Sequence, residues 1–188
     1  MVETAARLAD EQGAGALTLA AVADELGVRT PSLYKHVAGL PALRLLVAVR
    51  AKRELAACLS AATVGRSRLD ALRALSAAYR TWAAEHPASA AAAQSAPVPD
   101  DEDDQVASAA LVELVYGVLS GYGLTGDALV DATRTLRAGL SGWVALESSG
   151  AFGLDRPVTE SVEWWLTGLD RALDAPQPPA PRSHHTNA

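Results

Sequence analysis

Hydrophobic positions recur three to four residues apart along most of the chain, and this spacing predicts helices rather than strands. The chain is rich in Ala and Leu, contains one Phe, and shows no run of alternating Val, Ile or Thr. Gly and Pro residues mark the ends of the helical stretches. The pattern predicts an all-α protein of about nine helices, at residues 2–12, 19–26, 31–37, 40–62, 68–85, 88–95, 105–122, 127–149 and 159–173.

The stretch at residues 18–37 predicts two short helices joined by a tight turn. Thr18 can cap the first helix, and Gly27 follows that helix at a point where the backbone needs a positive φ. Thr30 can cap the second helix, and Pro31 suits its first position, because a missing N–H costs nothing there. The buried side of the first helix is expected to consist of Leu19, Val22, Ala23 and Leu26.

The second of these helices has an inward and an outward side. Leu33 and Val37 lie one turn apart and are expected to face inward. The outward positions carry hydroxyl, cationic and aromatic groups, which contact phosphates and base edges in nucleic-acid complexes. These residues are Ser32, Tyr34, Lys35 and His36. The arrangement is typical of a helix-turn-helix; the alternative is an ordinary helical hairpin with Tyr34 and His36 on its surface.

Residues 2–50 resemble the DNA-binding domain of the TetR family of transcriptional regulators. The string Gly27-Val28-x-x-Pro31-x-Leu33-Tyr34-x-His36-Val37 carries most of the resemblance. Further matching positions are Ala5, Ala6, Leu8, Gly13, Leu17, Thr18, Val22, Ala23, Leu26 and Leu43.

A recognition helix this short is expected to insert its N-terminal end into the major groove. Arg29 and Lys35 could contact guanine O6 and N7, and Pro31 could contact a thymine methyl group. The resemblance implies that Tyr34 and His36 hold phosphates. The candidate DNA-binding residues are therefore Thr18, Arg29, Thr30, Pro31, Ser32, Tyr34, Lys35 and His36.

The net charge of −6 argues against nucleic-acid binding if the chain is taken as a whole, but the charge is unevenly distributed between its two parts. Residues 1–53 carry seven Lys and Arg against five Asp and Glu, which is a net charge of +2. Residues 54–188 carry nine against seventeen, which is a net charge of −8. We therefore expect the N-terminal part to bind DNA with moderate affinity and with a salt dependence that is real but not steep.

The distribution of Gly, Pro and charge predicts two domains. Residues 1–40 are expected to form the helix-turn-helix domain, and residues 41–175 a ligand-binding and dimerisation domain that begins with a connecting helix at residues 41–62. The acidic segment at residues 97–104 is expected to be a solvated loop rather than a metal site. Residues 176–188 contain four Pro residues and are expected to be disordered.

One helix-turn-helix contacts too few bases to define an operator, so a homodimer is implied. Apolar strips on the last two long helices could form a four-helix bundle about a two-fold axis. The candidate interface residues are Leu136, Leu140, Trp143, Val144, Val162, Trp165, Leu166 and Leu169. Trp164 and Trp165 point about 100° apart, so one can enter the core while the other reaches the partner. The alternative is that both cover the core of their own chain.

The C-terminal half resembles a TetR subgroup that carries a Trp-His-Gly motif in its eighth helix. Gly142 matches the glycine of that motif. Ser141 stands where the subgroup has His, and Arg137 stands where it has Trp. These two departures put any inherited ligand assignment in doubt.

TetR relatives bind small molecules among the helices of this half, and the resemblance implies a pocket here. Its candidate residues are Tyr79, Trp82, His86, Tyr116, Tyr122, Arg137 and Ser141. Several have a plain alternative, since Trp82 and Tyr116 could be core residues and His86 a helix cap. Arg137 could pair with an anionic ligand or with an acid such as Glu113.

Three functions can be compared. The resemblance implies a ligand-responsive transcriptional regulator, foremost a repressor, that binds a two-fold symmetric operator and is released by a small-molecule effector. The alternative is a constitutive DNA-binding dimer without an effector, whose interior would be filled. An enzyme is not indicated, because the sequence has no nucleophile elbow, phosphate loop or paired metal ligands, and no cofactor or metal is expected.

The sequence also bears on location. We find no apolar run long enough to span a bilayer, and the N-terminus does not resemble a signal peptide. Cys58 is the single cysteine, so an internal disulfide is excluded. We therefore expect a cytoplasmic protein with no membrane partner.

Overall fold

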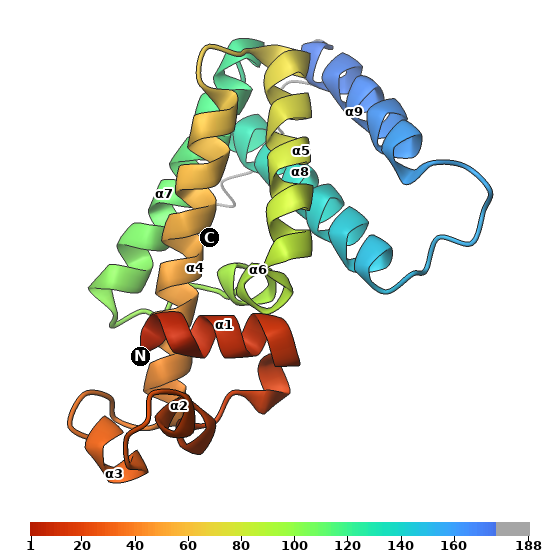
Figure 1. Cartoon of the computed structure of the whole chain (residues 1–188). Coiled ribbons are helices and arrows are strands. Elements are labelled where there is room, and N and C mark those ends of the chain that lie inside the picture. The colour runs from red at the N-terminus through yellow and green to blue at the C-terminus, as the bar shows by residue number, and fades with distance from the viewer. Residues whose placement is uncertain (176–188) are drawn as a thin grey trace, which may run out of the picture.

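The computed structural model describes residues 1–175, and this part of the chain is all-α (Figure 1). Its α-helices are α1 (Val2–Gln12), α2 (Leu19–Glu25), α3 (Thr30–Leu33), α4 (Leu40–Thr63), α5 (Arg68–Glu85), α6 (Pro87–Ala93), α7 (Glu102–Leu119), α8 (Gly126–Ser148) and α9 (Val158–Asp174). Two 3-10 helices follow α1 and α7, at Ala14–Ala16 and Ser120–Tyr122. The predicted all-α fold is confirmed for residues 1–175, whereas the disorder predicted for residues 176–188 lies outside the described residues.

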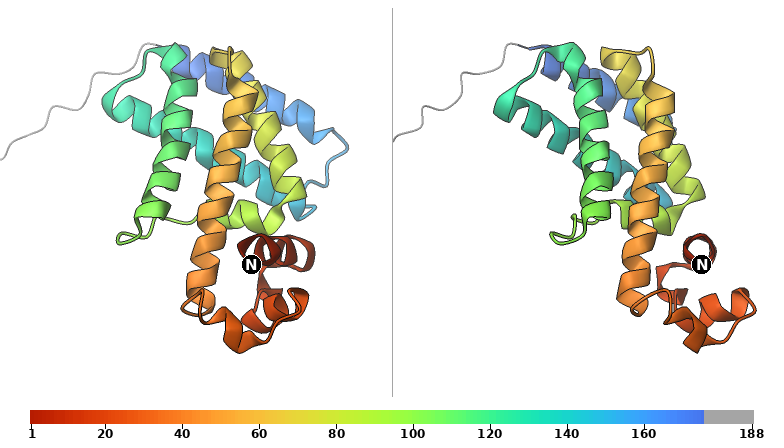
Figure 2. Two further views of the ribbon diagram at one scale, coloured as in Figure 1. Left: turned by 60° about the vertical axis from the view of Figure 1, so that its left-hand side comes forward. Right: turned by 90° about the vertical axis from the view of Figure 1, so that its left-hand side faces the viewer.

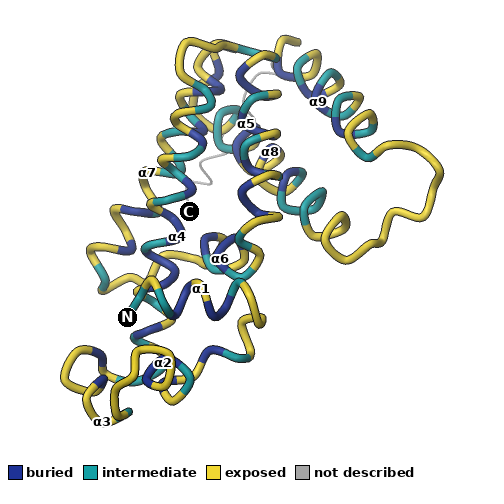
Figure 3. The backbone as a smooth tube through the Cα atoms, viewed as in Figure 1, coloured by how far each residue is buried: buried dark blue, intermediate teal, exposed yellow. Residues whose placement is uncertain are grey.

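The helices enclose two hydrophobic cores, and α4 contributes to both. The smaller core joins α1–α3 to the first turns of α4, and its buried side chains include Val22, Leu33 and Leu43. The larger core joins the rest of α4 to α5–α9 and includes Leu55 and Leu72. We call α1–α3 the head and α5–α9 the body. Figure 2 shows α4 running from the head up into the body, and Figure 3 shows buried residues recurring along α4.

The third helix is shorter than predicted. It was expected at residues 31–37, but α3 has four residues and ends at Leu33. The chain then continues as a turn, in which the backbone N–H groups of His36 and Val37 donate to the carbonyl of Leu33 at 2.9 and 3.0 Å. Leu33 and Val37 nevertheless both stay buried, at 4% and 5% exposure. The turn therefore keeps the same inward side that a full helix would have.

The acidic segment is more ordered than the expected solvated loop. Asp101 caps α7, because its side chain accepts from the backbone N–H of Asp104 at 2.8 Å. Asp104 is fully buried and pairs with the equally buried Lys52 of α4, with Nζ and Oδ1 2.6 Å apart. The backbone N–H of Val98 donates to the other oxygen of Asp104 at 2.8 Å. The loop prediction is therefore wrong for Asp104, which fixes the start of α7 to α4.

The environment of Asp104 favours its charged form. Burial alone would raise the pKa of Asp104, but the hydrogen bond from Lys52, the backbone hydrogen bond from Val98 and the charge of Lys52 together hold that pKa below its ordinary value. A carboxylate that stays ionised in the core needs this complete set of partners, because an unpaired buried charge is strongly destabilising.

Among the described residues, the 21-residue segment Glu102–Tyr122 is long and apolar enough to cross a membrane by length and composition, since it holds an 18-residue window with a mean hydropathy of 1.2. By length and composition alone, this segment contradicts the expectation that no apolar run is long enough to span a bilayer. The same segment starts with three acidic residues and packs against α4 and α8. We therefore describe it as a helix of the body.

Candidate nucleic-acid interface and effector cavities

The geometry of α2, the turn and α3 matches a helix-turn-helix. The hydroxyl of Thr18 accepts from the backbone N–H of Ala21 at 3.0 Å and so caps α2. Gly27 ends α2 with φ +67°, a conformation that side chains with a Cβ rarely adopt. The backbone N–H of Val28 then donates to the carbonyl of Ala23 at 2.9 Å. These bonds fix the angle at which α3 leaves α2.

The outward side of α3 and its following turn is open to solvent (Figure 3). Its exposed side chains are Arg29, Pro31, Ser32, Tyr34, Lys35 and His36, and Thr30 is half-buried. Tyr34 is 60% exposed. Within residues 1–175, neither Arg29 nor Lys35 has an acidic partner. The predicted DNA-binding residues therefore share one free surface, apart from Thr18, whose hydroxyl caps α2.

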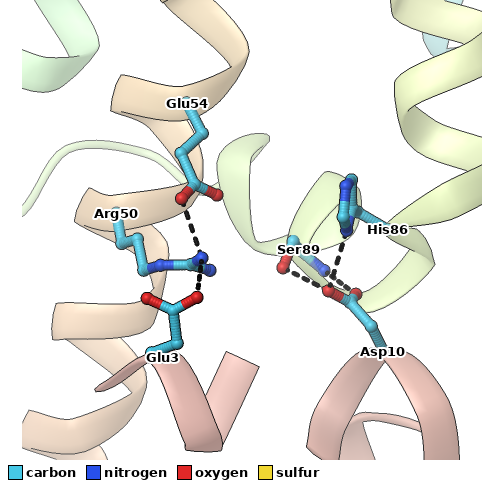
Figure 4. Close-up of polar contacts among 6 residues, drawn as sticks. All are labelled: Glu3, Asp10, Arg50, Glu54, His86 and Ser89. Atoms are coloured by element: carbon cyan, nitrogen blue, oxygen red, sulfur yellow. Dashed lines mark hydrogen bonds and ion pairs between the residues drawn. The ribbon is translucent and has the colours of Figure 1, made fainter. Parts of the chain in front are cut away.

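The junction between head and body holds a cluster of polar residues, of which the sequence analysis singled out His86 alone (Figure 4). Asp10 of α1 accepts from both the backbone N–H and the hydroxyl of Ser89 of α6, each at 2.8 Å. His86 lies beside this pair, with Nδ1 3.5 Å from Oδ2 of Asp10. Arg50 of α4 pairs with Glu3 of α1 at 3.4 Å. The head is therefore attached to the body through α6 as well as α4.

Three neighbouring cavities lie in the body. The outer cavity, of about 660 Å³, opens between α4, the α6–α7 segment, α7 and α8. The inner cavity, of about 40 Å³, is walled by leucines. The side cavity, of about 300 Å³, lies between α5, α6 and α8. A site of several hundred cubic ångströms can hold a small molecule.

Three of the predicted pocket residues line these cavities and four do not. Arg137 lines the outer and inner cavities, and Tyr79 and Ser141 line the inner and side cavities. The other four, which line none of the three cavities, are Trp82, His86, Tyr116 and Tyr122. Gln94 was not predicted, yet it lines all three cavities.

Two of the residues outside the cavities have structural roles. His86 ends α5 and stacks on Trp82, with ring centroids 5.3 Å apart. Tyr122 donates its hydroxyl to Asp170 at 2.6 Å, and the guanidinium of Arg68 lies 4.8 Å from the centre of its ring. Burial, followed by the hydrogen bond to Asp170, raises the pKa of Tyr122. Tyr122 therefore joins the end of α7 to α9 and is not available to a ligand in the cavities.

Most of the predicted dimer-interface residues face the core of their own chain. The buried ones are Leu136, Leu140, Val162, Leu166 and Leu169. Their apolar strip is the side with which α8 and α9 pack on the rest of the body. These five side chains are therefore covered by their own chain and, contrary to the prediction, are not free to contact a partner. Trp143, Val144 and Trp165 are half-buried.

The two adjacent tryptophans differ sharply in environment. Trp165 packs on Trp143, with ring centroids 6.3 Å apart, and lies so close to Gly139 that a Cβ there would overlap its ring. Trp164 is 77% exposed. Trp164 rather than Trp165 is therefore free to contact a partner.

Within residues 1–175 there is no group of three His, Cys, Asp or Glu residues that could hold a metal ion. Two of the three acidic residues at the start of α7 form ion pairs, Asp103 with Arg53 and Asp104 with Lys52.

Comparisons with known proteins match both parts of the chain. Residues 1–36 match the family described as bacterial regulatory proteins, tetR family, and residues 72–169 match the tetracyclin repressor-like C-terminal domain. The HTH-type transcriptional regulator Rv0681 of Mycobacterium tuberculosis is 34% identical over 175 residues, which is 91% of this chain and 80% of that protein. The HTH-type transcriptional regulator YobS of Bacillus subtilis is 32% identical over 90% of both chains.

Solved structures show the same fold. A protein of unknown function from Rhodococcus sp. RHA1 superposes with a TM-score of 0.77, at 23% identity and 93% coverage of both chains. A TetR variant from Acinetobacter baumannii in complex with minocycline superposes with a TM-score of 0.67, at 22% identity, over 92% of this chain and 93% of that one. The resemblance to the Trp-His-Gly subgroup stays a prediction. The family matches and the helix-turn-helix together establish that the chain belongs to the TetR family and is a transcriptional regulator, not an enzyme.

Proposed function

We propose that the protein is a repressor that binds a two-fold symmetric operator as a homodimer and is released from it by a small molecule. The observation that carries this proposal is the free surface on α3, where cationic, hydroxyl and aromatic groups gather above the buried Leu33. Groups of this kind read base edges and hold phosphates when they enter the major groove.

Most of the exposed groups on α3 and on the residues that flank it have a role in this proposal. Arg29 and Lys35 donate to O6 and N7 of guanines, and Pro31 contacts a thymine methyl group. Tyr34 and His36 contact phosphates beside the groove. The free backbone N–H groups at the start of α4 add a phosphate contact through their partial positive charge.

The dimer places two such surfaces on one face of the DNA. Exposed apolar side chains at the end of α8, in the α8–α9 connection and on α9 support a partner at this edge of the body. They are Leu146, Phe152, Leu154 and Trp164. A two-fold axis would bring the same patch of both chains together, as in most homodimers.

The cavities favour an effector over the constitutive alternative, because a body without an effector would be filled. A ligand that binds one arrangement of the body more tightly shifts the population toward it. Because α4 belongs to both cores, a change in its tilt moves the head and changes the distance between the two α3 helices. Coupling of this kind typically changes affinity by about 5- to 150-fold. The repressor would act in the cytoplasm, where a bacterial operator lies.

The test is to select bound sequences from random DNA with the full chain, and then to challenge the complex with a library of small molecules. A two-fold symmetric site that a compound releases supports the proposal. A symmetric site that no compound releases supports the constitutive dimer. The absence of any enriched sequence would contradict both.

A further inference from the structure

Within residues 1–175, Arg137 on α8 is exposed and has no acidic partner, although most arginines of the body have one. The paired arginines are Arg66, Arg68, Arg73, Arg80 and Arg156. Within residues 1–175, the polar partner of Arg137 is the amide oxygen of Gln94, at the long distance of 3.4 Å. A guanidinium that lines an apolar cavity with so weak a partner can still take a carboxylate, which it binds through two parallel hydrogen bonds.

Gln94 is an exposed residue that borders all three cavities. Its Nε2 donates to the hydroxyl of Tyr79 at 3.0 Å, while its Oε1 accepts from Arg137. Because Gln94 borders all three cavities, a rotation of this one side chain would join them. The amide therefore occupies the place where a ligand could reach Arg137, Tyr79 and Ser141 together.

We propose that the effector is a small amphipathic carboxylate that displaces the side chain of Gln94 and pairs with Arg137. This inference rests on the proposed ligand-responsive function and adds the chemical class of the ligand. The carboxylate accepts from Arg137 and from the hydroxyls of Tyr79 and Ser141. Because the inner cavity of about 40 Å³ is too small for an alkyl chain, the apolar tail lies in the outer cavity of about 660 Å³, beside Ala93, Leu111 and Val112.

The other charges around the cavities agree with an anion at this end. Lys52 lines the outer cavity, but its charge is neutralised by Asp104. Glu113 lines the same outer cavity as Arg137 and its charge opposes an anion there, so the carboxylate must lie closer to Arg137 than to Glu113. Ser108 also lines the outer cavity, and its hydroxyl oxygen is buried without a hydrogen-bond partner.

The test is calorimetric titration of the full chain with sodium octanoate as the probe, and with octylamine and 1-octanol as probes of the same length. We expect saturable binding of octanoate and weaker or no binding of the other two. Binding of octylamine in preference to octanoate would contradict the proposal, because it would show that Glu113 rather than Arg137 selects the ligand. No saturable binding of octanoate would also contradict it.

Two matched arginine variants locate the site. Arg137→Gln should bind octanoate about tenfold more weakly, since it loses a charge-assisted hydrogen bond. Arg134→Gln, three positions earlier on α8, should bind as the unmodified protein does, because Arg134 is as exposed as Arg137 but lines none of the three cavities. Equal affinities of the two variants would overturn the assignment. The melting temperature of each variant shows that it is folded.

A third variant keeps the test informative if Arg137→Gln is unstable. Gln94→Ala removes the side chain that borders all three cavities and leaves Arg137 without its amide partner. This variant should therefore bind octanoate at least as tightly as the unmodified protein. Weaker binding would contradict the displacement of Gln94. Operator binding is measured on the same samples. A protein that binds DNA but not octanoate refutes the ligand class alone, whereas one that binds octanoate but not DNA refutes the proposed function alone.

Discussion

Asp10 of α1 and Ser89 of α6 lie 79 positions apart and form two hydrogen bonds of 2.8 Å, in which the backbone N–H and the hydroxyl of Ser89 both donate to the carboxylate (Figure 4). Ser89 is in the first turn of α6, so the carboxylate of Asp10 caps that helix from another part of the chain. The far end of α6 leads to Gln94, which borders the cavities. One short helix therefore contacts the head at one end and the cavities at the other.

Replacing this carboxylate should loosen the head. Asp10→Ala should lower the free energy of unfolding by about 1–2 kcal/mol, because it leaves a buried serine and a helix end without their acceptor. It should also speed amide hydrogen exchange in α1 and α6. Gln12→Ala, an exposed change on the same helix, should alter neither quantity. Exchange rates in Asp10→Ala that equal those of the unmodified protein would show that Asp10 does not hold the head in place.

Lys35 should contribute both affinity and specificity to DNA binding. Lys35→Ala should weaken operator binding by about 1–3 kcal/mol and flatten the preference for the base it contacts. Fluorescence anisotropy with the selected operator and with single-base variants measures both effects. Arg171→Ala serves as the control, because Arg171 is an exposed cation on α9, remote from α3. If Lys35→Ala binds the operator as tightly as the unmodified protein, Lys35 does not contact the bases.

The buried ion pair should be a major determinant of stability. Asp104→Asn should lower the free energy of unfolding by about 3–5 kcal/mol, because Lys52 would keep its charge in the core without a counter-ion. Asp103→Asn, the neighbouring change, should cost less than about 1 kcal/mol, since the Asp103–Arg53 pair is exposed. Urea denaturation at pH 7 measures both values. Similar losses in the two variants would contradict the importance of burial.

The buried Asp104–Lys52 pair also predicts how the free energy of unfolding depends on pH. The pKa of Asp104 is lower in the folded protein than in the unfolded chain, so its contribution is present above the unfolded value of about 4 and is lost as the pH falls through the folded pKa. Urea midpoints of the unmodified protein should therefore fall as the pH is lowered from 5 to 2. In Asp104→Asn the decline should be shallower, and an identical decline would contradict the assignment.

Trp164 should belong to the dimer contact. Trp164→Asp should give monomers in sedimentation velocity, because it places a charge in an apolar interface, whereas Trp164→Phe should remain dimeric. Trp165→Asp should instead lower the melting temperature, since Trp165 packs on Trp143 and over Gly139. A Trp164→Asp protein that stays dimeric would move the interface to another surface.

Local patterns in the sequence were sufficient to predict the helix-turn-helix. The cap at Thr18, the positive φ at Gly27 and the Pro at the start of α3 are each set by neighbours within a few residues. Leu33 and Val37 also identified the buried side correctly. The length of α3 was overestimated, because helical spacing cannot distinguish a continuing helix from a turn that keeps the same side buried.

Contacts between distant parts of the chain could not be predicted. Asp104 belongs to an acidic run that is typical of a solvated loop, and its partner Lys52 lies 52 positions away. Five of the eight predicted interface positions are buried within their own chain, for a related reason. An apolar strip on a helix shows that the strip is covered, but it does not show whether the same chain or a second copy covers it. Exposure in the folded chain separates Trp164 from Trp165, which the sequence alone cannot do.

The central claim is that two α3 helices, presented by one dimer, lie in the major groove of the operator. Methylation interference at guanine N7 tests it most directly, because N7 faces the major groove. We predict two clusters of interfering guanines, with centres about 10 base pairs or a multiple of that apart. Lys35→Ala should lose one interfering guanine from each cluster. A single cluster, or interference confined to adenine N3 in the minor groove, would contradict the account.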